Sequence, residues 1–117
     1  MKNKILGTLA ILTGLTGIAR AGVIEGPEMA SAVLSGFGHH RYIFHFEANK
    51  IGTIRVTGKG SSNLDCSLTD GDGKVVMEDN RPVDGCYLTV LPQKSGPYHL
   101  VIDNRLKFDE AYQLITN

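Results

Sequence analysis

The sequence lacks any run of lysine or arginine residues, and its aromatic residues are not interleaved with basic ones. Proteins that bind nucleic acid carry a basic patch or stripe that contacts the phosphate backbone. The absence of such a stripe argues against nucleic acid as a partner. Over the whole chain, 12 basic residues balance 12 acidic residues.

Recognisable catalytic motifs are also missing. The sequence has no G-x-S-x-G elbow, no phosphate-binding loop and no H-E-x-x-H motif. His99 and Asp103 come nearest to an acid–base pair, but alternation along their strand predicts outward positions with no third member. We therefore predict a binding protein that uses no cofactor, rather than an enzyme.

Long hydrophobic runs are missing too. A transmembrane helix needs about 20 strongly apolar residues, and the apolar stretch 5–19 is shorter and rich in Gly and Thr. A positively charged start precedes it, and Ala19-Arg20-Ala21 fits a small-x-small cleavage site. The pattern predicts a signal peptide over residues 1–21, with an uncleaved anchor as the alternative. We expect a periplasmic or secreted protein with no stable membrane insertion after cleavage.

Cleavage would change the charge balance of the chain. Three basic residues and no acidic residue lie in the first 21 positions, so residues 22–117 hold 9 basic and 12 acidic residues. A mildly acidic protein is attracted to basic partners. We therefore expect a protein partner with a basic surface.

Cysteine is scarce, since only Cys66 and Cys86 occur, and they form no C-x-x-C redox motif. In an exported chain an even pair of cysteines predicts one structural disulfide, with two free buried thiols as the alternative. Closing a loop of this length stabilises a fold by about 3 kcal/mol in the chain-entropy model. Such a link matters in a domain with a small core.

Helical periodicity is almost absent beyond the signal peptide, and apolar residues alternate with polar ones instead. Residues 28–34 fit either a helix or a first strand. Turn signals every eight to twelve residues are typical of an antiparallel sandwich, so we predict one all-β domain over residues 22–117. The remaining predicted strands cover 41–47, 53–57, 64–69, 75–77, 86–90, 98–102 and 112–116.

Asp70-Gly71-Asp72-Gly73 suggests a calcium loop at first sight, yet it has a simpler explanation. The four residues are typical of a hairpin turn, and the spacing fails the EF-hand pattern because Lys74 takes the fifth position. An irregular oxygen site completed by Asp65, Asp79 and Asp84 is the alternative. We predict a hairpin turn and no metal.

Three histidines lie close together in the sequence but match no common zinc spacing. We place His39 and His40 in a glycine-rich loop, and we expect His45 on the polar face of its strand. The prediction is that these side chains are exposed and hold no metal.

The segment Ser95-Gly96-Pro97-Tyr98 separates two predicted strands. Gly96 and Pro97 favour a sharp reversal, and Ser95 and Tyr98 place two hydroxyl groups at its edges. Because Tyr98 alternates with Leu100, its ring is expected to point toward the core, with only the hydroxyl reaching the edge. The segment is therefore a candidate recognition turn, with an ordinary strand connection as the alternative.

Residues 42–115 contain four features: an aromatic strand, an N-L-D-C-S-L strand, the S-G-P-Y turn with its following strand, and a closing Y-Q-L. Together, over residues 42–115, they resemble the bacterial pre-peptidase C-terminal domain family. Cys66 stands where that family usually has an aliphatic residue. The resemblance implies a jelly-roll-like β-sandwich.

The S-G-P-Y turn also fits an S-G-x-Y loop, and Tyr112 and Thr116 fit part of a Y-x-x-x-T-x-G segment. In these features the chain is similar to the periplasmic inhibitors of i-type and g-type lysozymes, which are small β-sandwiches with signal peptides. The second segment belongs to the i-type group. Its final Gly has no counterpart here, because the sequence stops at Asn117, so the lysozyme class stays open.

This resemblance implies a lysozyme inhibitor whose Ser95–Tyr98 loop enters the active-site cleft, with Tyr112 and Thr116 as further target-binding residues. Ser95 would offer its hydroxyl to a catalytic carboxylate, while Tyr98 anchors the loop from below. The Gly-Pro pair would keep the loop stiff, which limits the entropy lost on binding.

A second class of function is the alternative to inhibition. In it, the chain is a non-enzymatic envelope or secreted module that binds glycan, matrix protein or another secreted protein. Such a module would use a face of the sheet, with calcium near Asp70 and Asp72 as an option. Inhibition of a lysozyme, or its absence, distinguishes the two classes.

Overall fold

The structure is a computed structural model, and it describes residues 28–117. The predicted signal peptide and its cleavage site lie outside the described residues. The described chain forms strands and loops, and it contains no helix long and apolar enough to cross a membrane. The strands are β1 (Glu28–Leu34), β2 (His39–Phe46), β3 (Gly52–Thr57), β4 (Leu64–Thr69), β5 (Val75–Asp79), β6 (Gly85–Val90), β7 (Gly96–Asn104) and β8 (Glu110–Thr116).

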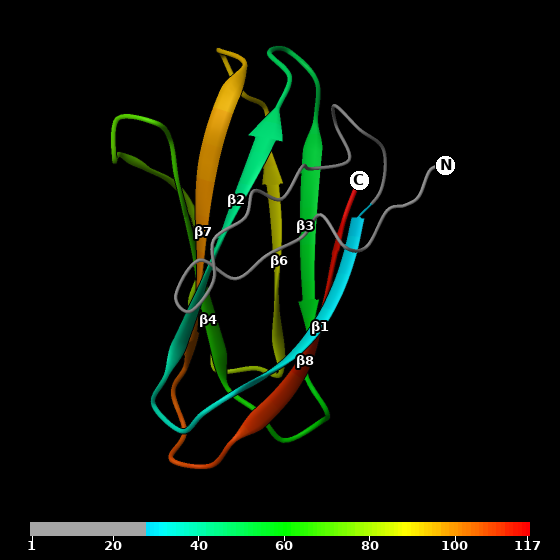
Figure 1. Cartoon of the computed structure of the whole chain (residues 1–117), viewed down its shortest axis with the longest axis vertical. Helices are drawn as coiled ribbons and strands as arrows, with labels where there is room; N and C mark the ends of the chain where they lie inside the picture. The colour runs from blue at the N-terminus through cyan, green and yellow to red at the C-terminus, as the bar shows by residue number, and fades with distance from the viewer. Residues whose placement is uncertain (1–27) are drawn as a thin grey trace.

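The strands form two stacked sheets of four strands each (Figure 1). One sheet has the order β1-β8-β3-β6, and the other has the order β2-β7-β4-β5. All neighbouring strands are antiparallel. Consecutive strands lie in different sheets, except β4 and β5, so most connections cross from one sheet to the other. Two four-stranded sheets joined in this way form a jelly roll. The prediction of an antiparallel, jelly-roll-like sandwich is confirmed.

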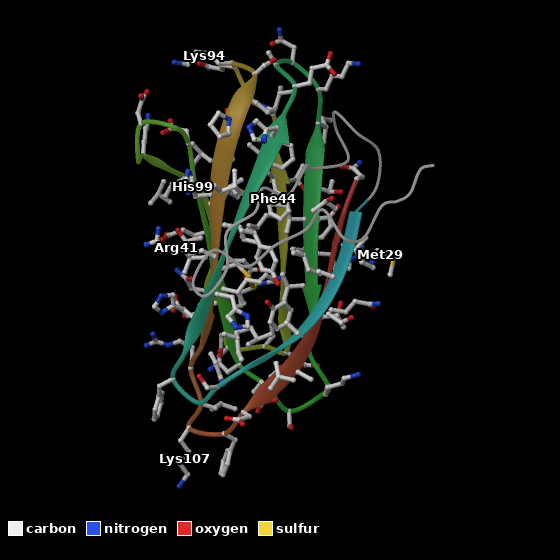
Figure 2. The ribbon with its side chains drawn as sticks, in the orientation of Figure 1. Met29, Arg41, Phe44, Lys94, His99 and Lys107 are labelled. Carbon is white, nitrogen blue, oxygen red and sulfur yellow. A yellow bond between two sulfur atoms is a disulfide. The ribbon has the colours of Figure 1, made fainter. Side chains whose placement is uncertain are left out.

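Alternate residues of the long strands face the opposite sheet and form a single core. Along β2 the side chains of Tyr42, Phe44 and Phe46 are buried, while the residues between them are not. The Tyr42 and Phe44 rings are stacked, with centroids 6.0 Å apart, and Figure 2 shows Phe44 in the middle of the sandwich. Burial of rings of this size is a main source of stability in a small domain.

The first described segment is a strand, which settles the choice between helix and strand for residues 28–34. Glu28 lies opposite Thr116 and Leu34 lies opposite Glu110, so β1 pairs with β8 along its whole length. Leu34 is buried and two alanines of β1 pack against the core. This period of two is typical of a strand with one buried face.

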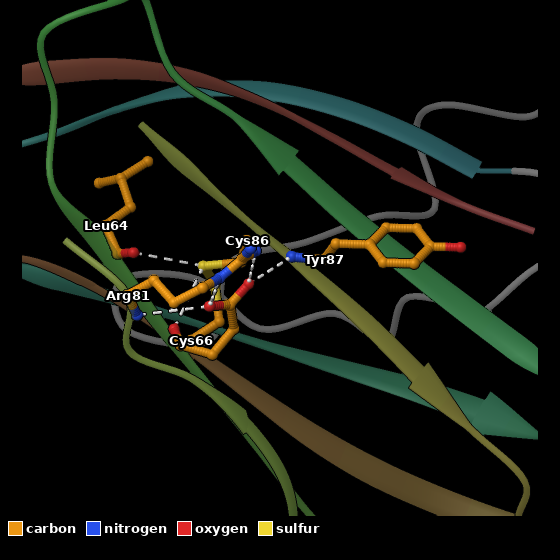
Figure 3. Close-up of a disulfide and its surroundings, with 6 residues drawn as sticks. Leu64, Cys66, Arg81, Cys86 and Tyr87 are labelled. Atoms are coloured by element: carbon orange, nitrogen blue, oxygen red, sulfur yellow. Dashed lines mark hydrogen bonds and ion pairs between the residues drawn. A yellow bond between two sulfur atoms is a disulfide. The ribbon is translucent and has the colours of Figure 1, made fainter. Parts of the chain in front are cut away.

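The predicted disulfide is confirmed, and it connects the two sheets. Cys66 lies on β4 and Cys86 lies on β6, and both side chains are buried (Figure 3). Their Cα atoms are 6.1 Å apart, which falls within the usual range for a disulfide. The bond therefore ties the edge strand β6 of one sheet to the inner strand β4 of the other through the core.

A buried carboxylate near the disulfide bridges the edge strands β5 and β6 of the two sheets. Asp79, at the end of β5, accepts hydrogen bonds from Nε and Nη2 of Arg81 at 2.8 and 2.7 Å. It also accepts one from the backbone N–H of Tyr87, on β6, at 2.9 Å. The bonds from Arg81 in particular lower the pKa of Asp79 to about 2, although burial of the carboxyl group opposes this shift.

Candidate functional site

The S-G-P-Y segment lies at one end of the sandwich, where β6 is joined to β7. Figure 2 places the neighbouring Lys94 at this end of the long axis, pointing away from the sheets. The side chains of Ser95 and Pro97 are exposed, whereas Tyr98 is only 7% exposed. Gly96, Pro97 and Tyr98 already belong to β7, so the chain reverses at residues 91–95. The sequence pattern predicted the reversal at Gly96 and Pro97, but the structure places it just before these two residues.

Two hydrogen bonds fasten this turn to the neighbouring loop between β2 and β3. The backbone N–H of Ala48 donates to Ser95 Oγ at 2.8 Å. The backbone N–H of Asn49 donates to the carbonyl of Pro92 at 2.8 Å. Because Ser95 Oγ acts as an acceptor here, its own hydroxyl proton stays available to an acceptor on another molecule.

The backbone at Gly96 explains the glycine of the motif. Gly96 has a φ of +150°, which residues with a side chain rarely adopt. A Cβ atom at this position would meet open space, so the conformation and not crowding demands glycine. Pro97 follows with a fixed φ of its own, and these two residues set the angle at which the turn leaves β7.

Tyr98 supports the turn from inside the sandwich. Its ring packs edge-on against Phe46, with centroids 5.5 Å apart, and its hydroxyl donates to the carbonyl of Lys94 at 3.3 Å. Burial raises the pKa of Tyr98, with a smaller contribution from the negative charge of Asp70. The prediction that this ring points toward the core is confirmed.

A groove of about 560 Å³ lies beside the turn, between residues 89–98 and the hairpin of β4 and β5. Val75 and Val76 line it from the hairpin, and Lys74 and Lys94 contribute cationic groups to its lining. The groove separates the turn from the hairpin. One flank of the turn is therefore accessible to a partner.

Asp70 stabilises the hairpin at the far side of this groove. Its Oδ1 accepts hydrogen bonds from the backbone N–H groups of Asp72 and Lys74 at 2.9 and 3.0 Å. The bond from Lys74 is the main reason why the pKa of Asp70 is lowered. Within residues 28–117, no group of three or more His, Cys, Asp or Glu side chains is placed to hold a metal ion. Asp70 thus acts as a turn former.

Tyr112 and Thr116 lie on β8, whereas Gly96, Pro97 and Tyr98 lie on β7 of the other sheet. Tyr112 is 2% exposed and Thr116 is 1% exposed, so neither side chain offers a surface to a partner. The hydroxyl of Tyr112 is hydrogen-bonded to the hydroxyl of Tyr42 at 2.5 Å and to His40 Nδ1 at 2.8 Å. Burial raises the pKa of Tyr112 far above its usual range. These contacts join the two sheets internally.

The histidines do not lie where the sequence suggested. His39 and His40 belong to β2 and not to a loop, because the strand continues outward to pair with Ile102 and Asp103. His40 is partly buried against Tyr112, and His45 is also only partly exposed, so the prediction of exposed side chains was wrong for both and is confirmed for His39. Burial, and then the nearby His39, lower the pKa of His40.

His99 and Asp103 do not form an acid–base pair either. His99 and Asp103 both lie on β7, four residues apart, which corresponds to about 13 Å along a strand. No proton can pass directly between side chains at that separation.

One contributor to the turn could not be identified from the sequence. Ala48 acts through its backbone N–H, which every residue except proline possesses. Its side chain gives no signal, and it lies 47 positions away from Ser95. Only the pairing of β2 with β7, which sets Phe46 opposite Gly96, brings the two residues together.

The fold is similar to those of several solved structures. The pre-peptidase C-terminal domain of a collagenase from Bacillus anthracis matches with a TM-score of 0.60 and 17% identity, over 76% of this chain and 87% of that one. PliG of Aeromonas hydrophila, a periplasmic lysozyme inhibitor of g-type lysozyme, matches with a TM-score of 0.58 and 14% identity, over 84% and 92%. Yersinia pseudotuberculosis-derived mitogen matches with a TM-score of 0.54 and 14% identity, over 78% and 84%.

Sequence comparison finds no matching family model and no matching curated protein. At identities of 14–17%, the structural likeness shows the fold and nothing finer. The resemblance to pre-peptidase C-terminal domains and to a lysozyme inhibitor is confirmed at that level. Function must therefore be argued from the residues of the turn.

Proposed function

We propose that this protein is an exported lysozyme inhibitor that inserts its β6–β7 turn into the active-site cleft of the enzyme. The observation that carries the proposal is the exposed hydroxyl of Ser95, held at one end of the sandwich by the N–H of Ala48. The similarity in fold to an inhibitor of g-type lysozyme supports it. A binding role suits these features better than catalysis.

The chemistry of lysozymes gives the hydroxyl a partner. Enzymes that cleave glycosidic bonds generally use carboxyl groups beside the scissile bond. Ser95 accepts a hydrogen bond from Ala48 and can donate its proton to such a carboxylate. A hydrogen bond to a charged group is stronger than one between neutral groups. Ser95 would thus form a hydrogen bond directly to a catalytic carboxylate of the lysozyme.

The rigidity of the β6–β7 turn allows a small contact surface to bind with useful affinity. The turn is fixed by Ala48 at Ser95, by Asn49 at Pro92 and by the buried ring of Tyr98. A loop that is ordered before binding loses little conformational entropy on binding. Tyr98 therefore contributes to affinity as a support rather than as a contact.

Charge favours the same class of partner. After the predicted cleavage the domain carries 9 basic and 12 acidic residues. Net negative charge attracts a basic enzyme and raises the rate of encounter, more so at low salt. In contrast, a glycan without charge would gain nothing from this balance.

The test is a titration of the exported protein against c-type, g-type and i-type lysozymes in a cell-wall lysis assay. Ser95→Ala should weaken inhibition of the sensitive class about tenfold or more, because a hydrogen bond to a charged group is lost. Ser95→Thr retains a hydroxyl group and should retain most of the inhibition. Ser61→Ala is the matched control, since Ser61 is an exposed serine in the loop between β3 and β4.

A second variant tests insertion independently of the hydroxyl. Gly96→Arg introduces a bulky residue at a φ of +150° and should abolish inhibition. On a soluble oligosaccharide the wild-type protein should raise KM and leave kcat unchanged, as expected of a competitor for the cleft. Unchanged inhibition by a folded Ser95→Ala/Gly96→Arg variant, or no inhibition of any lysozyme, would refute the proposal.

A further inference from the structure

The end of the sandwich opposite the turn carries two exposed aromatic rings. Phe37, between β1 and β2, is 72% exposed, and Phe108, between β7 and β8, is 62% exposed. Figure 2 places the neighbouring Lys107 at this end, with its side chain pointing away from both sheets. We refer to Phe37, Lys107 and Phe108 as the phenylalanine tip. Exposed rings on two adjacent loops mark a surface for interaction.

The two loops of the phenylalanine tip are fastened to each other through their backbones. The N–H of Phe37 donates to the carbonyl of Leu106 at 2.8 Å. The N–H of Gly36 donates to Asp109 Oδ1 at 3.2 Å. Gly36 also packs so closely that a Cβ atom there would clash with the carbonyl of Lys107. The two rings are therefore carried by one rigid body.

A buried asparagine satisfies the polar groups beneath the tip. Asn104 Nδ2 donates to the carbonyls of Ser35 and Phe108 at 3.1 and 2.7 Å. Asn104 Oδ1 accepts from the N–H of Leu106 at 3.0 Å, and the N–H of Asn104 donates to the carbonyl of Gly38 at 2.9 Å. Backbone groups that are bonded inside the protein do not require water. The tip can therefore enter an apolar phase without losing these bonds.

The backbone at Phe37 is in an unfavourable conformation. Its φ is +56°, in the left-handed region that bulky residues rarely occupy. The exposed ring gains no burial in return. Strain that turns an apolar ring outward is typical of a functional surface and has no use in packing.

A cation stands beside the rings. Lys107 Nζ lies 5.3 Å from the centroid of the Phe108 ring. Of the other charged groups near the tip, Asp109 accepts a hydrogen bond from Gly36, Glu110 is buried, and Arg105 Nε lies 3.6 Å from Asp65 Oδ2, so Lys107 is the cation that stands beside the Phe108 ring. In a lipid surface, the ammonium group of Lys107 could contact an anionic headgroup while the adjacent apolar ring contacts the acyl chains below it.

We propose that the phenylalanine tip inserts into an anionic lipid surface, with both rings at the level of the upper acyl chains and Lys107 at the level of the phosphates. A rigid apolar projection with bonded backbone groups and an adjacent cation fits the interface of a bilayer. The rings stand at the ends of loops, and the groove beside the turn lies at the other end of the molecule. This inference goes beyond lysozyme inhibition, because the turn stays free.

The absence of tryptophan from the sequence permits a direct test. The exported protein with Phe108→Trp is mixed with vesicles of phosphatidylcholine and phosphatidylglycerol, and tryptophan emission is recorded. We expect a blue shift at physiological salt, where charges farther away than about 8 Å are screened and the local contact of Lys107 counts most, and a smaller shift with phosphatidylcholine alone. An unchanged emission spectrum with anionic vesicles at physiological salt would overturn the proposal.

Sedimentation with the same vesicles tests the rings themselves. Phe37→Asn combined with Phe108→Ser should lower the partition coefficient about tenfold or more, since two apolar rings are lost. Asparagine tolerates a left-handed φ, so this variant is expected to fold. Ile51→Ser is the matched control, because Ile51 is an exposed apolar residue at the turn end.

The outcomes separate this proposal from the preceding one. Equal sedimentation of the double variant and the wild type would overturn the lipid proposal, since binding would then arise elsewhere in the chain. Binding of the tip to a protein or a glycan without vesicle binding would also overturn it. Vesicle binding is measured without lysozyme, and the double variant should inhibit lysozyme in solution as the wild type does. Failure of either proposal therefore leaves the other measurement intact.

Discussion

At the turn end of the sandwich a hydroxyl group faces solvent from Ser95, whereas at the opposite end two rings face solvent from Phe37 and Phe108. Each end joins two loops into one body by hydrogen bonds between a side chain and the backbone. At the turn end the exposed serine is itself the joining residue. At the other end the buried Asn104 joins the loops and the exposed rings take no part.

At the phenylalanine tip, the residues proposed to bind a partner differ from the residue that stabilises the loops. At the turn end, Ser95 has both roles. A substitution of Ser95 removes a recognition group and a structural bond together. A substitution of either phenylalanine removes a recognition group and leaves the bonds of Asn104 in place. Variants at the two ends should therefore show different relations between loss of binding and loss of stability.

The largest effect is expected where the turn depends on the core. Tyr98→Ala should lower the free energy of unfolding by about 3–4 kcal/mol, because the deletion of a buried ring leaves a cavity beside Phe46. Tyr98→Phe retains the ring and should cost only about 1 kcal/mol through the lost bond to Lys94. Denaturant titration measures both values. A small cost for Tyr98→Ala would show that the turn does not rely on this ring.

An intermediate effect is expected from Asp79, which belongs to neither end. Its pKa of about 2 lies below the usual 3.8, so the folded state favours the ionised form. The shift corresponds to about 2 kcal/mol of stability, which is present above pH ~4 and is lost as the pH falls toward 2. Asp79→Asn should therefore lower the free energy of unfolding by about 2 kcal/mol at pH 7.

The pH dependence provides the control for Asp79. The difference between wild type and Asp79→Asn should shrink between pH ~4 and pH ~2, where the wild-type carboxylate becomes protonated. Asp72→Asn, at an exposed position of the β4–β5 turn, should leave the stability curve nearly unchanged. A difference that stays constant down to pH 2 would contradict the assignment of this pKa.

The smallest effect is expected at the phenylalanine tip, and its sign is opposite. Phe37→Gly should raise the free energy of unfolding by about 1 kcal/mol, because glycine relieves the left-handed φ and the exposed ring packs against little. The same variant should bind anionic vesicles more weakly. Thermal unfolding and vesicle sedimentation measure the two effects. Lower stability of Phe37→Gly would mean that the ring contributes to packing after all.

The fold follows from the sequence where one physical rule dominates. Alternation of apolar and polar residues located the strands, since a strand with one buried face has a period of two. The rule failed at His39 and His40, because pairing with β7 extends β2 past the point where the apolar pattern ends. The same rule did not decide whether residues 28–34 form a helix or a strand. Pairing with β8 makes them a strand.

The candidate site was less accessible to sequence reasoning. The motif of Ser95 and Tyr98 is visible because side chains carry it, and the inward phase of Tyr98 follows from alternation. The contribution of Ala48 is invisible, because a backbone N–H has no sequence signature. The exposure of Phe37 and Phe108 is equally hidden, since a phenylalanine in a loop is expected to find a core.

The pairing of β1 with β8 also determines how the molecule can be attached to something else. Glu28 lies opposite Thr116, and Figure 1 shows the C terminus in the half of the sandwich that carries the β6–β7 turn. A bulky domain fused behind residue 117 would crowd the turn and leave the phenylalanine tip unobstructed. On a sensor surface, coupling through the C terminus would present the rings outward. Coupling through the loop at residues 58–63 would present the turn instead.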